Sequence, residues 1–148
     1  MCHISQYLSA EHTQCDTLFA EAESAVSEAR WEHAASLYGR FREKTEQHFQ
    51  REEGVLFPAF ERATGISAGP TEVMRSEHGQ MRRLLSRLDS ALASRDAERF
   101  LGEAETLLTV MQQHNLKEEN MLYRMAGQVL ASQADAVVRK MKSVGGPA

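Results

Sequence analysis

The chain has 148 residues and a formal net charge of −4, from 21 acidic and 17 basic side chains. Its length suits one domain, and 42% hydrophobic with 26% charged residues is the composition of an ordinary globular protein, so neither a disordered nor a fibrous chain is expected. Because the charges are interspersed without a long basic run, we expect no nucleic-acid partner and no membrane partner.

The first residues, MCHISQYLSAEH, reach polar side chains too early for the apolar centre of a secretory signal. No stretch approaches the roughly 18 consecutive apolar residues of a membrane span, so a cytoplasmic location is expected. Along a helix, Cys2 and Cys15 would lie up to about 20 Å apart, whereas a disulfide joins Cα atoms within about 7 Å. Both are therefore predicted to be free thiols, which fits a reducing compartment.

Apolar residues recur at helical spacing along most of the chain and predict four long amphipathic helices, at about 4–28, 32–63, 70–93 and 97–130. Pro70 suits the first turn of the third helix, and Ser94 and Asp96 are candidate N-caps of the fourth. Short connections favour antiparallel neighbours, so the predicted fold class is all-α, an antiparallel up-down-up-down four-helix bundle with a short C-terminal helix near 132–142.

An internal repeat with an offset of 66 residues relates the two halves of the chain. It aligns His12 with His78 and His48 with His114. The segment EHTQCDTLF at 11–19 aligns with EHGQMRRLL at 77–85, and HFQREEGVLFPAF at 48–60 aligns with HNLKEENMLYRMA at 114–126. We therefore expect a single domain over residues 1–148, built from two helical hairpins at about 4–63 and 70–130.

The histidines within each half are 36 residues apart, so their midpoints fall at residues 30 and 96, where the periodicity independently places turns. Residues equidistant from the turn of an antiparallel hairpin lie level with each other, and a glutamate four residues after a histidine shares its face. Glu53 and Glu119, one position further along, are expected to be turned away by about 140°.

Four imidazoles and two carboxylates would thus meet in an apolar interior, where an unpaired carboxylate costs several kcal/mol. Two bridging carboxylates, with two imidazoles for each ion, suit a pair of divalent metals about 3.5 Å apart, as in a non-haem di-iron centre. The alternative is a metal-free polar layer in a structural bundle. The predicted metal ligands are His12, His48, Glu52, His78, His114 and Glu118.

At these residues the sequence resembles the hemerythrin-like, HHE cation-binding family over nearly the whole chain. The resemblance rests on His12, on HFQREEGVLFPAF, on SEHGQMRRLL and on HNLKEENMLY, because a glutamate pair and an apolar pair recur at both HxxxE sites. It implies a four-helix bundle around two iron ions (Fe2+/Fe3+) with a bridging oxo or hydroxo group, held by the six predicted ligands.

The ligand set differs from that of oxygen-carrying hemerythrins, which have a second histidine one turn after the first in the third helix, where this chain has Arg82. Four histidines and two glutamates resemble instead the di-iron proteins that repair iron-sulfur clusters under nitrosative stress, and the iron-sensing hemerythrin domain of an F-box protein. The expected function is therefore binding of O₂ or NO for sensing, scavenging or stress response, with a small diatomic ligand or peroxide as the partner.

Two alternatives remain open: an enzyme that decomposes peroxide or reduces NO at the same centre, and an iron donor in iron-sulfur cluster repair. The sequence leaves open the catalytic residues, the identity of the metal and any protein partner.

Candidates for supporting roles around the ligands are Glu11, Cys15, Asp16, Glu77 and Arg82. The two glutamates precede ligand histidines, so each is a candidate acceptor for an imidazole N–H or a gate on the ligand's path. Asp16 and Arg82 are either surface ion pairs or hydrogen-bond partners of an exogenous ligand, and Cys15 is either a buried filler or a redox-active thiol.

Spacing does not decide whether a tyrosine approaches the site; the candidates are Tyr7, Tyr38 and Tyr123. Two further histidines, His3 and His33, lie outside the repeat pattern and are expected to be exposed.

Overall fold

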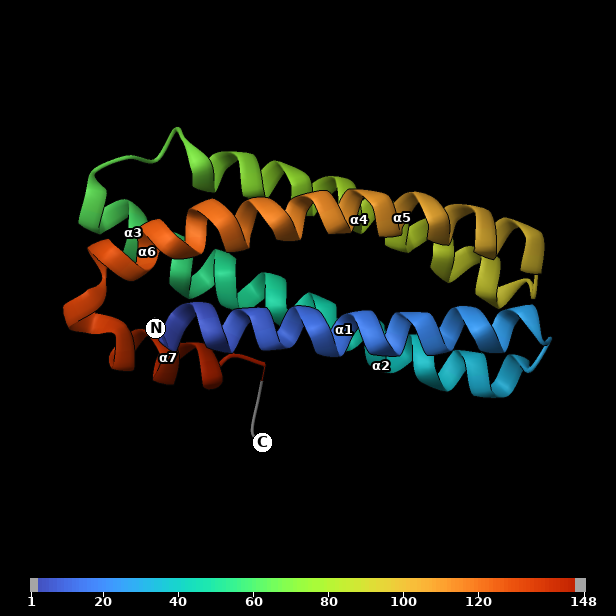
Figure 1. The fold of residues 1–148 in the computed structure, drawn as a ribbon. Coiled ribbons are helices and arrows are strands. Elements are labelled where there is room, and N and C mark those ends of the chain that lie inside the picture. Colours follow the sequence, from blue (N-terminus) through green and yellow to red (C-terminus); the bar gives the residue numbers. More distant parts are fainter. Residues whose placement is uncertain (1–2, 146–148) are drawn as a thin grey trace.

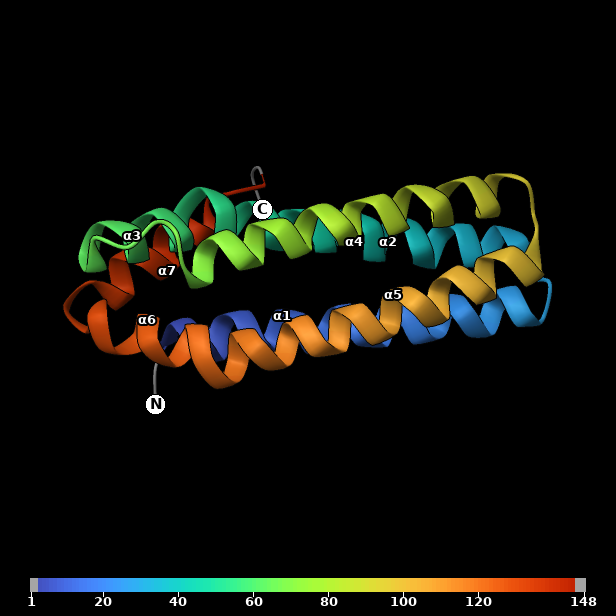
Figure 2. The same cartoon turned by 90° about the horizontal axis from the view of Figure 1, so that it is seen from above.

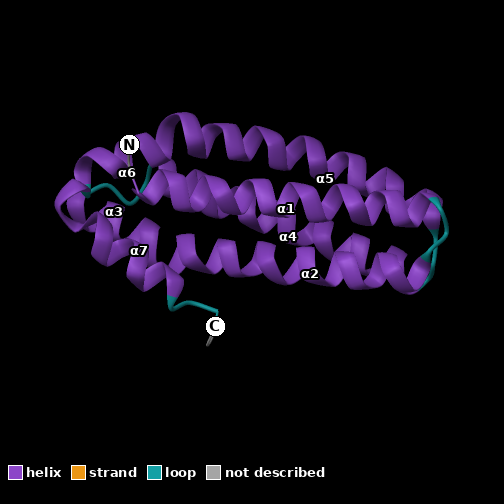
Figure 3. Cartoon of the chain, turned by 60° about the horizontal axis from the view of Figure 1, so that its bottom comes forward, coloured by secondary structure: helices purple, strands orange, loops and turns teal. Residues whose placement is uncertain are grey.

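The computed structural model describes residues 3–145, which form helices joined by short turns, without a β-strand in this range (Figure 3). The helices are α1 (His3–Ser27), α2 (Trp31–Arg51), α3 (Phe57–Thr64), α4 (Pro70–Ala93), α5 (Ala97–Lys117), α6 (Tyr123–Val129) and α7 (Ala134–Lys142). Two π-helical turns, η1 (Glu52–Leu56) and η2 (Glu118–Leu122), join α2 to α3 and α5 to α6, and a 3₁₀ turn, η3 (Ala131–Gln133), precedes α7. The predicted all-α bundle is confirmed.

Each half of the chain folds back on itself as a helical hairpin, because α1 packs along α2 and α4 packs along α5 (Figure 1). Seen from above, the connections from α1 to α2 and from α4 to α5 lie at the same end of the bundle (Figure 2). The hairpins meet through α1 against α5 and α6 and through α2 against α4. Residues 66 positions apart therefore come to corresponding places in the bundle.

The two hairpin turns adopt the same backbone conformation at positions related by the repeat. Ala29 has a φ of 58° and Arg95 a φ of 53°, in the left-handed region that commonly ends a helix. In each turn the next amide donates to a carbonyl five residues earlier, at 2.9 Å and 3.0 Å. The turns expected at residues 30 and 96 are thus confirmed.

Two of the three predicted helix-boundary residues have the expected role. Pro70 is the first residue of α4, and Asp96 is the N-cap of α5, where its Oδ1 accepts a hydrogen bond from the Arg99 amide at 3.1 Å. The prediction for Ser94 is wrong: it follows the last residue of α4 in a helical conformation and caps no N-terminus. The left-handed residue Arg95 separates it from α5.

The second and fourth helices expected at 32–63 and 97–130 are each interrupted by a π-helical turn that begins at the glutamate of the HxxxE motif. In η1 the Phe57 amide donates to Glu52 O, and in η2 the Tyr123 amide donates to Glu118 O, so each hydrogen bond spans five residues instead of four. Such turns occur mostly as single insertions within α-helices, and they are frequent at functional sites. A search for one constant helical period cannot detect these turns, because the apolar residues on either side of each turn keep α-helical spacing.

Two apolar clusters fill the interior and leave a polar layer between them. The cluster on the side of the hairpin turns includes Phe19, Phe41, Met81, Leu85, Leu88, Phe100 and Leu107. The cluster on the side of α7 includes Ile4, Leu8, Leu56, Phe57 and Tyr123. Removing apolar surface from water stabilises the fold by about 25 cal/mol per Å². This stabilisation in the two clusters offsets the cost of holding polar groups between them.

The expected C-terminal helix is present as η3 and α7, which packs against α1 and η1 near the start of α1 (Figure 1). Val137 and Met141 are its buried residues. Arg51, the last residue of α2, donates from Nε to Met141 O at 3.0 Å and from Nη2 to Val144 O at 3.3 Å. The end of α7 is therefore tied to the segment that carries Glu52.

Of the two predicted free thiols, Cys15 is buried and forms no disulfide, whereas Cys2 lies outside the described residues. Within residues 3–145, none of the helices combines the length and the apolar character that a membrane span requires.

Candidate metal centre

The structure brings all six predicted ligands together in the polar layer. Each hairpin contributes two histidines from its long helices and one glutamate from the first position of its π-helical turn. All six are buried, with exposed fractions of 0% to 5%. They are His12 on α1, His48 on α2, Glu52 in η1, His78 on α4, His114 on α5 and Glu118 in η2.

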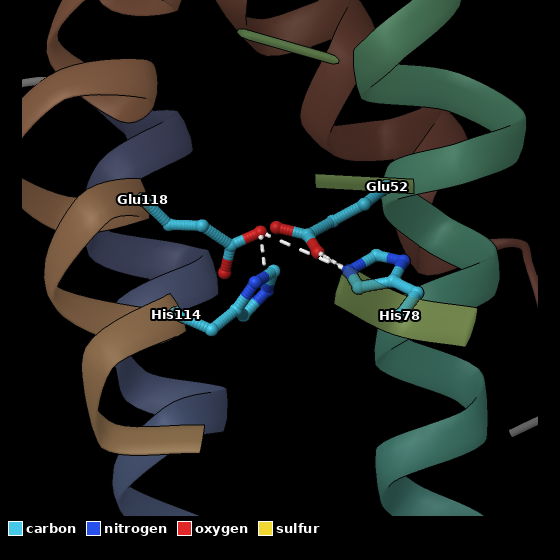
Figure 4. Close-up of side chains that lie close together, drawn as sticks. All are labelled: Glu52, His78, His114 and Glu118. Carbon is cyan, nitrogen blue, oxygen red and sulfur yellow. Dashed lines mark ion pairs between the residues drawn. The ribbon is translucent and has the colours of Figure 1, made fainter. Parts of the chain in front are cut away.

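The six residues form two overlapping groups whose possible ligand atoms lie within 4.8 Å of one another. One group, here called the α4/α5 position, contains Glu52, His78, His114 and Glu118 (Figure 4). The other, the α1/α2 position, contains His12, His48 and Glu118. Because Glu118 belongs to both groups, its carboxylate is common to the two positions.

The α4/α5 position contains four buried side-chain atoms without a hydrogen-bond partner: Glu52 Oε1, His78 Nε2, His114 Nε2 and Glu118 Oε2. His78 Nε2 lies 3.1 Å from Glu52 Oε1, and His114 Nε2 lies 3.2 Å from Glu118 Oε2, without the alignment of a hydrogen bond. A buried polar atom left unpaired costs about 1–3 kcal/mol, and more when it is charged. Four such atoms facing one another fit a bound cation.

The types of donor atom narrow the choice of cation. Imidazole nitrogens together with carboxylate oxygens suit iron, manganese or zinc better than calcium or magnesium, which prefer oxygen ligands alone. The buried cluster therefore indicates a metal-binding site, and its residues fit a transition-metal ion.

Each of the four histidines is held from behind by a glutamate that accepts a hydrogen bond from its Nδ1. The distances are 2.6 Å for His12 with Glu119, 2.8 Å for His48 with Glu11, 2.7 Å for His78 with Glu53 and 2.8 Å for His114 with Glu77. With Nδ1 occupied in this way, every imidazole presents Nε2 to the centre of the layer. A carboxylate behind a metal-bound histidine fixes its tautomer and ring orientation and makes it a stronger ligand.

These four glutamates form two repeat pairs, of which sequence reasoning identified one. Glu11 and Glu77 were candidates for this hydrogen bond, and each does accept one from a histidine of the neighbouring helix. The expectation that Glu53 and Glu119 are turned away is wrong. The π-helical turn rotates less per residue than an α-helix, so the residue after the inward glutamate still reaches the adjacent helix. The doubled glutamate at both HxxxE sites was the available signal.

Basic side chains stand outside three of these glutamates. Arg51 forms an ion pair with Glu11, and Lys117, its mate in the repeat, forms one with Glu77. Arg82 donates from Nη1 to Glu53 Oε2 at 2.8 Å. Burial opposes ionisation of Glu53, but its hydrogen bonds with His78 and Arg82 outweigh that effect and lower its pKa to about 2.

Ionisation in the metal-free layer is governed by burial acting against the facing charges. Burial disfavours the imidazolium of His114, but the Glu118 carboxylate outweighs it and raises the pKa of His114 to about 9. Burial and the charge of Glu118 raise the pKa of Glu52. Burial opposes the charge of Glu118 itself, yet His114 and the surrounding donors hold its pKa well below the usual range.

The remaining candidates lie at the edge of the centre or away from it. Arg82 is bound to Glu46 and Glu53, so it supports a glutamate and does not point at the ligand nitrogens. Asp16 is exposed. Partial burial of its carboxyl raises its pKa, and the charge of Glu119 acts in the same direction, whereas His12 acts to lower the pKa and is outweighed. Cys15 is buried and its Sγ accepts a hydrogen bond from Thr45 at 3.7 Å.

Among the three tyrosines, Tyr123 enters the polar layer, and its hydroxyl donates to Glu52 Oε2 at 2.6 Å. Tyr38 instead bonds to Asp89 at 2.6 Å, and Tyr7 lies under Arg51 and Lys142 beside α7. His3 and His33 are exposed, as expected.

The Glu77→Gln variant should bind metal about 10- to 100-fold more weakly than the wild type, because the amide keeps an acceptor for His114 but loses the charge that makes the imidazole a strong ligand. Competition with a chromophoric chelator measures this change. Glu72→Gln on the exposed face of the same helix is the matched control and should leave the affinity unchanged. Equal affinities for both variants would contradict the role given to Glu77.

Comparison with known proteins supplies the family. Searches of curated proteins and of solved structures found no match to this chain. Residues 3–126, which include all six clustered side chains, match the model of the hemerythrin HHE cation binding domain. By this match, over most of its length, the chain belongs to the hemerythrin HHE cation-binding family.

Proposed function

We propose that the protein holds two iron ions at the α4/α5 and α1/α2 positions, with an oxo or hydroxo bridge, and binds O₂ or NO there for sensing, scavenging or a stress response. The observation that carries the proposal is the pair of overlapping His/Glu groups that share Glu118. Four imidazoles with two carboxylates leave coordination places for solvent and a small ligand on two adjacent ions.

The burial of the centre supports a small ligand. His78, Glu52 and Glu118 are 0% exposed, and the other three ligands are at most 5% exposed. A molecule with several heavy atoms would have to separate the helices to reach them. A diatomic molecule or peroxide requires only small fluctuations of side chains.

The chain's own residues have three tasks in this function. The four outer glutamates orient the imidazoles through Nδ1, so that Nε2 of each faces the centre. The two apolar clusters exclude bulk water from the layer, which strengthens every electrostatic interaction within it. The hydroxyl of Tyr123 supplies a hydrogen-bond donor inside the layer. When bound, the metal pair would supply the redox change and the open coordination places.

The test is elemental analysis of protein purified without added metal, followed by optical spectra before and after dithionite and after exposure to air or NO. We expect two irons per chain and near-ultraviolet bands that bleach on reduction and change with the gas, without rapid turnover. Protein that contains no metal after purification, and takes up no Fe2+ when it is supplied, would overturn the proposal.

The same samples separate the two alternative functions. Rapid consumption of peroxide or NO, lost in His48→Ala and retained in His33→Ala, would identify an enzyme. Iron that dialyses away against a chelator, with a large loss of helical signal in circular dichroism, would identify an iron donor. Either result would replace the proposed role in ligand binding.

A further inference from the structure

The histidine rings of the two halves of the centre are arranged with similar distances and angles. The rings of His12 and His48 lie 4.8 Å apart at 57°, and those of His78 and His114 lie 5.0 Å apart at 58°. The aromatic residue five positions after each inward glutamate repeats this correspondence. Tyr123 stacks on His12 at 5.8 Å and 23°, and its repeat mate Phe57 stacks on His78 at 5.7 Å and 26°.

The two aromatic residues differ by one hydroxyl group, and that group lies within the ligand cluster. Tyr123 is 0% exposed, and its hydroxyl donates to Glu52 Oε2 at 2.6 Å. The hydroxyl oxygen of Tyr123 also lies 2.9 Å from Glu118 Oε1 and 3.2 Å from His12 Nε2. Phe57, lacking a hydroxyl, makes no such bonds to the other half of the cluster.

The two halves also differ in which ligand atoms lack a hydrogen-bond partner. All four belong to the α4/α5 position, on the side of Phe57. At the α1/α2 position, His12 Nε2 lies 3.0 Å from Glu118 Oε1 and 3.2 Å from His48 Nε2. Glu52 belongs to the α4/α5 group but not to the α1/α2 group. Its Oε2 accepts the hydrogen bond from the Tyr123 hydroxyl.

We propose that Tyr123 makes the two metal positions unequal, so that the first ion binds at the α4/α5 position and the second binds more weakly at the α1/α2 position. An ion at the α4/α5 position meets four buried atoms that form ion pairs with one another but make no hydrogen bond. An ion at the α1/α2 position must first displace Tyr123 from Glu52 and separate His12 from Glu118. Tyr123 acts as a positioning residue, and its role rests on the metal binding proposed above.

The size of the difference follows from the bonds that must be broken. A hydrogen bond to a charged group changes an equilibrium constant by about ten- to a hundredfold. We therefore expect the wild-type protein to take up Fe2+ in two steps whose affinities differ by about that factor.

Anaerobic titration of the metal-free protein with Fe2+ against a competing chelator tests the inference. Tyr123→Phe should strengthen the second step by about ten- to a hundredfold and bring the two steps together. Phe57→Tyr, the matched change at the repeat mate, should weaken the first step. At one equivalent of Fe2+, His12→Ala should retain the tight step and His114→Ala should lose it.

Circular dichroism of each metal-free variant shows whether it folds. Should Tyr123→Phe fail to fold, Phe57→Tyr and the two histidine variants still decide the question, because they leave the Tyr123 hydrogen bond to Glu52 in place. Two equal steps in the wild type, or a second step that is unchanged in a folded Tyr123→Phe, would overturn the inequality and leave the metal centre intact. A wild-type protein that takes up no Fe2+ would overturn the proposed function itself.

Discussion

Replacing Glu118 with glutamine is expected to abolish tight metal binding at both positions. Glu118 is the one residue common to the two ligand groups, and it is 0% exposed. Its Oε1 lies 3.0 Å from His12 Nε2, and its Oε2 lies 3.2 Å from His114 Nε2. Glutamine keeps the volume but removes the negative charge and one acceptor. The loss should exceed the 10- to 100-fold effect typical of removing a residue that only supports a ligand.

The measurement is metal content per chain after loading and desalting, with affinities from chelator competition. Glu105→Gln, an exposed change on α5, is the matched control and should retain wild-type metal content. Glu119→Gln, next to Glu118 but bonded to His12 from behind, should give an intermediate loss. A Glu118→Gln protein that still binds metal with wild-type affinity would contradict the role given to Glu118.

The metal-free protein is expected to lose stability as the pH rises from about 6.5 to about 9. The pKa of His114 rises from 6.5 to about 9 in the folded state, because the Glu118 carboxylate outweighs the effect of burial. A raised folded-state pKa gives stability that is fully present below the unfolded value and is lost as the pH passes the folded value. At about 1.4 kcal/mol per pKa unit, His114 alone accounts for a change of the order of 3 kcal/mol in the free energy of unfolding.

Two neighbours act in the same direction. The carboxylates of Glu52, Glu11 and Glu118 outweigh burial and raise the pKa of His48, and the hydrogen bonds of His78 with Glu52 and Glu53 outweigh burial and raise the pKa of His78. Towards acid the sign reverses: the lowered pKa values of Glu53 and Glu118 give stability that is lost as the pH falls from about 4.5 towards 2. The metal-free protein should be most stable between these two ranges, at the end near pH 4.5, because above that pH the raised pKa of Glu52 begins to cost stability.

Bound metal should reverse the loss of stability that the metal-free protein shows as the pH rises above about 6.5. Imidazoles bind a metal only when their Nε2 is deprotonated, so metal affinity, and the stability that it adds, increase over the range in which the metal-free protein weakens. Urea unfolding of metal-loaded and chelator-treated protein, at pH values from 6 to about 9, compares the two slopes. His114→Gln should remove much of the alkaline loss in the metal-free protein, whereas the exposed His33→Gln should retain it. A metal-free protein that gains stability across this range would contradict the charge distribution described here.

Much of the fold and the whole candidate ligand set followed from spacing along the chain. Helical periodicity located the long helices, and the 66-residue repeat aligned His12 with His78 and Glu52 with Glu118. These signals are strong because a helix brings residues three and four positions apart onto one face, whatever lies opposite. The same local rule failed at Glu53 and Glu119, where a single π-helical turn changes the direction of the next side chain.

Contacts between distant segments account for what spacing could not reveal. The hydrogen bond of His12 with Glu119 joins residues 107 positions apart, and the contact of His12 with Tyr123 joins residues 111 positions apart. Sequence spacing left Tyr7, Tyr38 and Tyr123 equivalent, because which of them enters the polar layer depends on how the hairpins pack. Helix formation and the inward face of each helix are local properties, so the residues alone specify them. The partner of each imidazole, and the inequality of the two halves, arise when the two hairpins dock and bury one hydroxyl among the carboxylates.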